Sequence, residues 1–186
     1  MVELKPTELK GYRIQLRSLK KGDAVPLFHH YFGSTSSSKF LARQPYKSIE
    51  QVDDFLNQWT QNAWSSAGSP FAWVIADIVA SEPIGIFLVF PKMQEVEIHY
   101  GISEMHAGHG YASEACDLAT TWLLDQKGIE LVQTAVDVEH FATQRVLEKS
   151  GFQKKEILKN RLVLPAFGPE SRDAILYQKN KLALAK

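Results

Sequence analysis

The sequence predicts an α/β domain with seven strands, in the order β-α-α-β-β-β-α-β-α-β-β. Short segments in which apolar residues alternate or run together are typical of strands. Longer segments repeat apolar residues every three or four positions, as one buried face of a helix does. The gaps between the three middle strands, at 71–77, 83–90 and 95–102, are too short for the crossovers of parallel pairs, so these strands are expected to be antiparallel.

One strand and two helices precede these middle strands. Residues 12–17 alternate between apolar and polar, which predicts a half-buried strand. Asp23 follows a turn and is expected to cap a short helix, and the small polar residues 33–38 are expected to form a loop. Ser48 is predicted to begin a longer helix, because Gln51 follows it at the spacing of a capping box.

The strongest helix signal covers residues 111–127. Its apolar residues lie on one stripe, and Gly128 is expected to terminate it. A helix that ends at Gly151 is predicted by the same reasoning. The remaining elements are predicted to follow as strand, helix, strand and strand, at 131–138, 140–150, 153–158 and 174–178. No repeat or long linker divides the chain, so residues 1–186 are expected to form a single domain with its core at about 11–180.

The composition excludes several classes of function. Basic and acidic residues both number 21, and this zero net charge argues against binding nucleic acid or an anionic membrane through bulk charge. No apolar run approaches the roughly 18 residues of a membrane span, and the start lacks the apolar segment of a secretory signal. Cys116 is the only cysteine, which excludes an intrachain disulfide and a cysteine-built metal site. We therefore expect a cytoplasmic protein without a metal.

The most informative segment is Ala107-Gly108-His109-Gly110-Tyr111-Ala112-Ser113, just before the long helix. Its glycines let the backbone curl closely around a ligand. The free N–H groups of the helix start, together with the helix dipole, favour a phosphate group there. A loop that only turns the chain is the alternative for so short a motif. A P-loop would need Gly-Lys-Ser/Thr, and a Rossmann fingerprint would need a third glycine.

Three segments carry a wider signature: Glu97-Ile98-His99-Tyr100, Gly108-His109-Gly110-Tyr111-Ala112-Ser113-Glu114-Ala115 and Arg145-Val146-Leu147-Glu148-Lys149-Ser150-Gly151-Phe152. In their order and spacing they resemble the GNAT superfamily of N-acetyltransferases, in particular the branch that contains RimJ and RimL. The resemblance implies a GNAT-type mixed, mostly antiparallel seven-stranded sheet with helices on both faces. It also implies acetyl-CoA as co-substrate, no metal, an amine acceptor, and a homodimer as in many family members.

The resemblance further implies where acetyl-CoA binds. Strands 95–102 and 131–138 are expected to splay apart around pantetheine, with a backbone N–H near Tyr100 or Ile102 as the oxyanion donor. Two positions depart from the family pattern, since Ala107 replaces Gln or Arg and His140 replaces Asn. The residues expected to bind the coenzyme are Tyr100, Ile102, Gly108, His109, Gly110, Tyr111, Ala112, Ser113 and His140.

Direct attack of a neutral amine on the thioester requires a base and a proton source for the leaving thiolate. Family members often use a glutamate on the fourth strand, so Glu97 is the expected base, acting through a water. Its alternative role is that of a salt-bridged surface carboxylate. Leu147 stands where many relatives have a tyrosine acid, and the RimL-like branch indicates Thr143 instead. The alternative for Thr143 is a hydroxyl bonded to its own helix backbone.

Some alternatives stay open at this point. His99 is a candidate to line the acceptor pocket, and Cys116 is expected to be a buried small hydrophobe. Trp59, Trp64 and Trp73 are more typical of a core than of a substrate clamp. The acceptor is either the α-amine of a protein N-terminus or a small amine such as a polyamine, an amino acid or an antibiotic. A non-catalytic acyl-CoA-binding module and a CoA-independent interaction protein are the competing functions.

Overall fold

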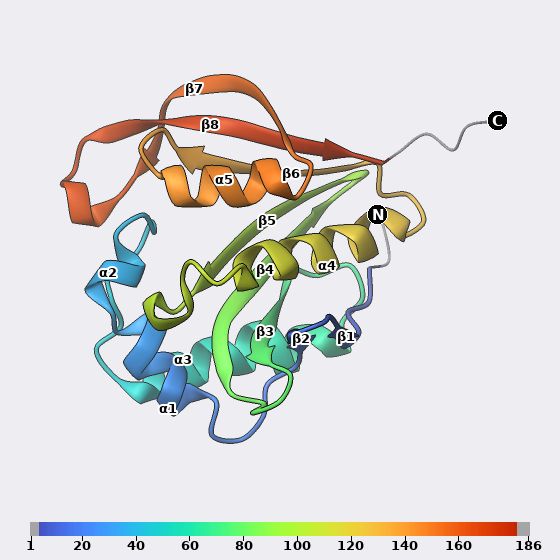
Figure 1. Ribbon diagram of the computed structural model, residues 1–186, viewed down its shortest axis with the longest axis vertical. Coiled ribbons are helices and arrows are strands. Elements are labelled where there is room, and N and C mark those ends of the chain that lie inside the picture. The colour runs from blue at the N-terminus through green and yellow to red at the C-terminus, as the bar shows by residue number, and fades with distance from the viewer. Residues whose placement is uncertain (1–3, 182–186) are drawn as a thin grey trace.

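An open eight-stranded sheet runs through the computed structural model, which describes residues 4–181 (Figure 1). The strand order is β1-β2-β3-β4-β5-β6-β8-β7, and every neighbouring pair is antiparallel except β5 and β6. The seven predicted strands are present. The strands are β1 (Leu9–Lys10), β2 (Ile14–Arg17), β3 (Phe71–Asp77), β4 (Pro83–Lys92), β5 (Glu95–Ile102), β6 (Leu131–Asp137), β7 (Gln153–Val163) and β8 (Ser171–Asn180).

Helices cover both faces of this sheet, as expected from the sequence. Helices α4 (Tyr111–Asp125) and α5 (Phe141–Lys149) pack on one face, while α1 (Ala24–Leu27) and α3 (Ile49–Leu56) pack on the other (Figure 1). None of the described helices combines the length and the apolar character needed to cross a membrane. The shorter helical elements are η1 (Phe28–Phe32), α2 (Thr35–Ser38), η2 (Asn57–Asn62), η3 (Ala63–Ser65), η4 (Glu104–His106) and η5 (Pro165–Phe167).

The core has two layers, and strand β3 contributes to both of them. Phe71, Trp73 and Ile75 belong to the layer beneath α4 and α5. Ala72 and Val74 alternate with them and pack under α1 and α3. A strand that is buried on both faces reads as a continuous apolar run, which explains why the sequence predicted β3 so clearly.

Asp23 occupies the N-cap position of α1, as predicted, but its side chain does not cap the helix. Asp23 has helical backbone angles and makes no capping hydrogen bond. Its carboxylate instead accepts two hydrogen bonds from the fully buried Arg17, at 2.7 and 2.9 Å, and a third from the backbone N–H of Lys20 at 2.7 Å. Arg17 occupies a polar position of the predicted alternation, and a charge buried this deeply requires such a partner. The buried Arg17 therefore explains why the carboxylate of Asp23 forms an ion pair and does not cap the helix.

Two other elements near the N-terminus differ from expectation. Residues 33–38 are not entirely a loop, because Ser34 caps the single turn α2 by accepting a hydrogen bond from the N–H of Ser37 at 3.2 Å. The extra strand β1 pairs with β2, and two residues are too few to show an alternating pattern. The predicted cap at Ser48 is confirmed, since its hydroxyl accepts from the N–H of Gln51 at 3.4 Å.

The helices and strands in the second half of the chain are of the predicted type, but several differ in length from the prediction. Helix α4 ends at Asp125, so Gly128 follows the helix without being its terminal stop. Helix α5 does end just before Gly151, which has a φ of 80°. Strands β7 and β8 extend well beyond the predicted ranges. Their added residues are mostly polar and exposed at the edge of the sheet, so apolar periodicity could not reveal them.

Candidate active site

The sheet opens between its two central strands. Strands β5 and β6 pair only at three positions, where Glu95, Val96 and Glu97 face residues 131–133. Beyond these positions β5 stays bonded to β4, and β6 stays bonded to β8. The sequence expectation that strands 95–102 and 131–138 diverge is therefore confirmed, and the facing edges beyond Glu97 have no strand partner.

Backbone donors of β5 point into this gap. In an antiparallel pair, successive residues direct their N–H groups alternately toward the partner strand and away from it. The N–H of Ser103 donates to the carbonyl of Ile84 on the β4 side at 2.8 Å. By this alternation the N–H groups of Tyr100 and Ile102 point to the opposite edge, where β6 has already diverged. A polar group placed in the gap would find two aligned donors.

A glycine-rich turn lies at the wide end of the gap. Gly108 and Gly110 have φ angles of 79° and 82°, a left-handed conformation that is costly for other residues. Gly110 leads directly into α4, and no side chain caps this helix. The first N–H groups of a helix have no acceptor within it, so those of Tyr111, Ala112 and Ser113 are available. With the helix dipole they form an anion-binding position.

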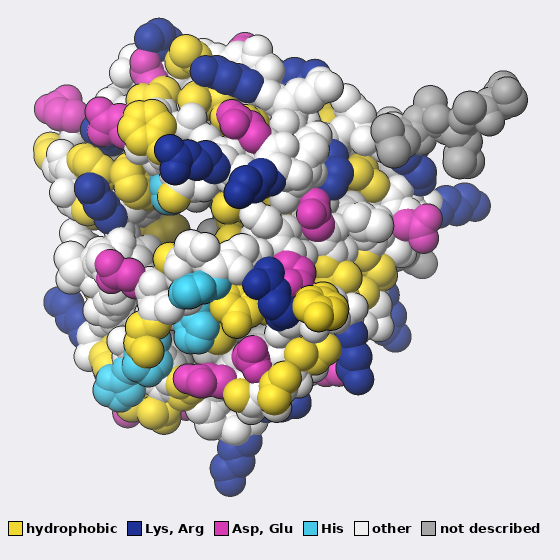
Figure 2. All heavy atoms as spheres, viewed as in Figure 1, with side chains coloured by type: hydrophobic (Ala, Val, Ile, Leu, Met, Phe, Trp, Pro, Cys, Tyr) yellow, Lys and Arg dark blue, Asp and Glu magenta, His cyan; other side chains and the backbone are white. Residues whose placement is uncertain are grey.

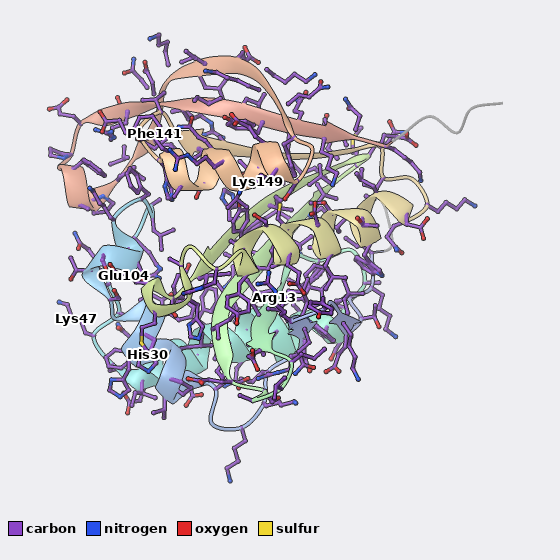
Figure 3. All side chains as sticks on the ribbon, viewed as in Figure 1. Arg13, His30, Lys47, Glu104, Phe141 and Lys149 are labelled. Atoms are coloured by element: carbon purple, nitrogen blue, oxygen red, sulfur yellow. The ribbon has the colours of Figure 1, made fainter. Side chains whose placement is uncertain are left out.

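Arg13 of the N-terminal segment braces this turn. Its backbone N–H and its Nε donate to the two carboxylate oxygens of Glu114 at 2.7 and 3.0 Å, and its Nη1 donates to the carbonyl of His109 at 2.7 Å. Burial alone would raise the pKa of Glu114, but the hydrogen bonds from Arg13 and Ile14 outweigh it and hold the pKa below its usual range. Figure 3 shows Arg13 alongside α4. The ion pair between Arg13 and Glu114, together with the hydrogen bond from Arg13 to His109, therefore holds the glycine-rich turn in place.

A cavity of about 490 Å³, called the first cavity here, joins the turn to the gap. Helix α5 forms its other wall. Of the predicted site residues, Glu97 and His109 do not line it, and the carbonyl of His109 is bound by Arg13. The predicted residues that do line it are Tyr100, Ile102, Gly108, Gly110, Tyr111, Ala112, Ser113, His140 and Thr143.

Two cations in the first cavity were not anticipated from the sequence. Arg145 and Lys149 lie one turn apart on α5 and line the cavity opposite the glycine turn. Figure 2 shows basic side chains over α5 beside a hollow in the surface, and Figure 3 shows Lys149 on the part of α5 nearest α4. Residues four positions apart lie next to each other on a helix surface, so this pair of cations could have been recognised from the sequence. Such cations suit phosphate groups.

His140 and Thr143 form a pair where α5 meets the gap. The hydroxyl of Thr143 lies 2.9 Å from Nε2 of His140, so its partner is this ring and not the helix backbone. The imidazole also stacks on Phe40, with ring centroids 4.1 Å apart. Burial lowers the pKa of His140 to about 4, which leaves the ring neutral near pH 7. The pair is therefore uncharged, and its hydroxyl can form a hydrogen bond with a group in the gap.

Glu97 lies in an ion-pair cluster on the opposite face of β5. Its carboxylate contacts Nε2 of His99 at 2.9 Å and accepts a hydrogen bond from Nζ of Lys92 at 2.6 Å. The His99 contact is the main cause that lowers the pKa of Glu97 to about 2; burial opposes it and Lys92 assists. A carboxylate with so low a pKa is a weak base. His99 thus stands between Glu97 and the nearest cavity.

That second cavity has a volume of about 570 Å³ and lies on the α1 and α3 side of the sheet. His99 lines it, as the sequence suggested, and so does Trp59, which was expected to be core. Trp73 is fully buried in the core. The two cavities meet at the gap, because they share Tyr31, Phe40, Leu41, Tyr100, His140 and Thr143.

Two further polar groups are buried near the gap. The hydroxyl of Tyr100 has no hydrogen-bond partner among the described residues, and burial raises its pKa well above the usual value. Cys116 is fully buried, as expected, and burial raises its pKa to about 12, so the thiol is not an available nucleophile. Residues 4–181 contain no group of three His, Cys, Asp or Glu side chains placed to hold a metal ion.

Comparison with known proteins shows which family has this architecture. The family model described as acetyltransferase (GNAT) domain matches residues 13–153, which include the glycine turn and both strands at the gap. Among curated proteins, the uncharacterized N-acetyltransferase YoaA of Bacillus subtilis (strain 168) is 25% identical over 154 residues. This match covers 81% of the chain and 85% of the relative.

Solved structures share the fold at low sequence identity. RimJ of Mycobacterium smegmatis in complex with CoA-disulfide has a TM-score of 0.81 and 16% identity, covering 94% of this chain and 88% of RimJ. The spermidine N-acetyltransferase of Vibrio cholerae, in complex with CoA and spermine, has a TM-score of 0.74 and 16% identity, covering 91% of this chain and 96% of that one. At such identities these likenesses establish the fold and leave the acceptor open.

Proposed function

The chain belongs to the GNAT acetyltransferase family, and from this membership we propose that it transfers the acetyl group of acetyl-CoA directly to a primary amine. One observation carries the proposal. The free edge of β5, with the N–H groups of Tyr100 and Ile102, opens into the same cavity as the left-handed turn at Gly108 and Gly110. An extended amide chain that ends in a diphosphate matches these two features together.

In this proposal the diphosphate binds the amides of residues 108–113, and Arg145 and Lys149 supply positive charge to the phosphates. Pantetheine lies in the gap, where its amides can pair with the free edge of β5 as a strand would. The thioester carbonyl accepts from the N–H of Tyr100 or Ile102, which stabilises the negative charge that develops on its oxygen. Because these contacts come from the backbone, they do not require a family side chain at Ala107.

The attacking amine must lose its proton before or during the reaction. We propose that Glu97 serves this step as a positioning residue, while the imidazole of His99 faces the second cavity and takes the proton. The contact of 2.9 Å between the Glu97 carboxylate and His99 supports this division, since a carboxylate at this distance holds the imidazole ring in one orientation. The low pKa of Glu97, about 2, argues against direct proton abstraction by the carboxylate.

The leaving thiolate needs a proton at the other side of the gap. We propose that the hydroxyl of Thr143 donates to the sulfur and that His140 behind it positions this hydroxyl. The 2.9 Å contact between them and their place where both cavities meet support the assignment. Leu147 is fully buried and offers no acid, so Thr143 is the available hydroxyl on this helix.

The acceptor is a separate part of the proposal. The sequence resemblance suggests the α-amine of a protein N-terminus, and a small amine is the alternative. The second cavity favours the small amine, because its volume of about 570 Å³ falls within the range of small-molecule sites.

The proposal is tested by measuring the affinity for acetyl-CoA and the release of free thiol from acetyl-CoA in the presence of primary amines. We expect calorimetry to give a dissociation constant between roughly 1 µM and 1 mM, and we expect thiol release to depend on the amine. No detectable binding would overturn the proposal. Binding without thiol release for any amine or N-terminal peptide would support a non-catalytic module instead.

A pair of variants adds a control to this experiment. Thr143→Val keeps the shape of the side chain and removes the hydroxyl, so we expect kcat to fall roughly 10- to 100-fold with unchanged acetyl-CoA affinity. Thr121→Val makes the same change on the exposed face of α4, away from both cavities, and should leave kcat unchanged. Equal kcat values for the two variants would remove Thr143 from the mechanism.

A further inference from the structure

The residues that line the second cavity indicate which kind of acceptor fits there, which the proposed reaction alone does not specify. It opens at the gap, where it shares Tyr100 and Thr143 with the first cavity, and it extends across the opposite face of the sheet. An amine that attacks the thioester from this side would leave the rest of its molecule inside the cavity. The chemistry of the lining therefore selects the body of the acceptor.

One wall of the second cavity is aromatic. The rings of Phe32 and Phe55 lie 5.0 Å apart, those of Phe55 and Trp59 lie 6.0 Å apart, and those of Trp59 and Phe90 lie 5.5 Å apart. These residues come from four different elements, η1, α3, η2 and β4, so the folded chain assembles a continuous ring surface. Such surfaces favour apolar and aromatic groups through burial and edge-to-face contacts.

The charges of the second cavity disfavour an acceptor with a second ammonium group. Asp137 is the one acidic residue among the described residues that line it, and Nε and Nη2 of Arg172 already bind its carboxylate at 2.6 and 3.1 Å. Burial alone would raise the pKa of Asp137, but the hydrogen bonds from Arg172 outweigh it and keep the carboxylate charged and paired. His140 is neutral, so the cavity offers no unpaired anion.

Aromatic rings also attract cations, which raises the opposite possibility of an ammonium-binding cage. At the Phe32 end of the aromatic wall, a cation of the protein already occupies that role. The guanidinium of Arg43 lies over the rings of Tyr31, Phe32 and Tyr46, at 5.8, 5.0 and 4.7 Å from their centroids. Because Arg43 also lines the second cavity, its positive charge would repel another ammonium group there.

We infer that the acceptor is a monoamine with an apolar, aromatic body, and not a polyamine. The inference rests on the proposed function for the direction of attack. The amine nitrogen forms the new N–C bond while the C–S bond breaks, and one amine proton passes to His99 and from there to water. The thiolate leaves with a hydrogen bond from Thr143 and takes its proton from water. The ring of the acceptor then lies against Trp59 and Phe90, and no further charge of the acceptor enters the cavity.

The test compares 2-phenylethylamine with spermidine, 1,4-diaminobutane and a peptide that begins with serine. The ratio of kcat/KM should favour 2-phenylethylamine by roughly 10-fold or more, the range expected for contacts of this kind. A polyamine or the peptide with an equal or higher kcat/KM would overturn the inference. Such an outcome would leave acetyl transfer itself established, so the failure of the inference is distinct from the failure of the proposed function.

Amine binding to the CoA-bound protein, measured by calorimetry, provides a readout independent of turnover. If 2-phenylethylamine binds more tightly than spermidine without any acetyl transfer, the preference of the second cavity for an aromatic monoamine stands, and the proposed acetyl transfer fails. If 2-phenylethylamine neither binds nor reacts, the inference is wrong whatever the other amines do.

A matched pair of variants on β7 tests the role of charge. Leu162 is half-buried and lines the second cavity, whereas Leu158 is half-buried on the same strand and lines neither cavity. Leu162→Glu supplies the missing carboxylate and should lower the preference for 2-phenylethylamine over spermidine by roughly 10-fold or more. Leu158→Glu should leave the preference unchanged. Equal preferences in the two variants would contradict the inference.

Discussion

At the scale of single residues, contacts decide which chemistry a side chain can perform. Glu97 is the base expected from its position in the sequence, yet its carboxylate contacts both His99 and Lys92. These contacts stabilise the charged form and lower the pKa to about 2, so the carboxylate orients a proton acceptor more readily than it accepts a proton. The distinction could not be drawn from residue types alone.

The lowered pKa of Glu97 predicts a pH-dependent contribution to stability. A carboxyl group whose pKa falls from 4.5 to about 2 on folding stabilises the folded state above pH 4.5, and this contribution is lost as the pH falls through about 2. The shift corresponds to about 3 kcal/mol as an upper bound, since the cluster is partly exposed and screened. Glu97→Gln should therefore lower Tm at pH 6 and make little difference near pH 2.

Thermal unfolding of both proteins between pH 2 and pH 6 measures this effect. Lys92→Met serves as a control, because it removes one cause of the low pKa and should move the loss of stability to a higher pH. A difference in Tm between wild type and Glu97→Gln that stays constant over the whole range would contradict the argument.

Part of the candidate site follows from the sequence and part does not. The glycine turn and Thr143 were identified because their residues are local motifs or match the family at fixed spacing. The brace between Arg13 and Glu114 joins residues 101 positions apart, and no local pattern marks the partner of either. The His140–Thr143 contact depends on the burial of one side of α5, which follows only from packing.

At the scale of elements, the glycine turn and α4 act as one unit. Gly110 combines a φ of 82° with a close approach, since an added Cβ would lie 3.1 Å from Nη2 of Arg13. Gly110→Ala should lose about 1–2 kcal/mol of stability through its left-handed backbone. It should also shift the turn against Arg13 and weaken acetyl-CoA binding, roughly 10-fold or more if one backbone contact is lost.

Gly22→Ala is the matched control for this prediction. Gly22 has a φ of 94°, an added Cβ there meets no atom within 4 Å, and the residue lines neither cavity. Urea unfolding should show a similar loss of stability for both variants, and calorimetry should show weaker acetyl-CoA binding for Gly110→Ala alone. Unchanged affinity in Gly110→Ala would separate the turn from the binding site.

Long or fully buried elements were the predictable ones. Helix α4 and strand β3 have strong apolar patterns, because a whole stripe or both faces are buried. The missed elements β1 and α2 have two and four residues, too few to show a period. The predicted range of strand β7 was too short because almost all of its side chains are exposed. Its hydrogen bonds to β8 therefore leave no pattern in the sequence.

At the scale of the whole molecule, the sheet consists of two halves that meet at a narrow junction. Strands β1–β5 and β6–β8 are joined by only three parallel pairs, with α4 and α5 packed beside the junction (Figure 1). Nothing in the alternation of residues 95–102 indicates that pairing stops after Glu97. This opening was expected only through the family resemblance, since periodicity reports which face of a strand is buried and not which neighbour it bonds.

A ligand in the gap should join the two halves, and this gives a prediction for the molecule as a whole. At a concentration 100 times its dissociation constant, acetyl-CoA stabilises the folded state by about 2.7 kcal/mol. For a protein of this size, that corresponds to a rise in Tm of roughly 5–10 °C. Amide hydrogen exchange should slow at the free edge of β5, at the facing edge of β6 and in residues 108–113, because each gains a partner in the complex.

ADP separates the two parts of this effect, since it carries a diphosphate and no pantetheine. It should slow exchange in residues 108–113 while residues 98–102 exchange as in the free protein. Acetyl-CoA should slow exchange in both segments, because only the extended amide chain can take the position of a strand between β5 and β6. If acetyl-CoA raised Tm and left the exchange of residues 98–102 unchanged, the coenzyme would bind outside the gap, and the proposed oxyanion donors at Tyr100 and Ile102 would be excluded.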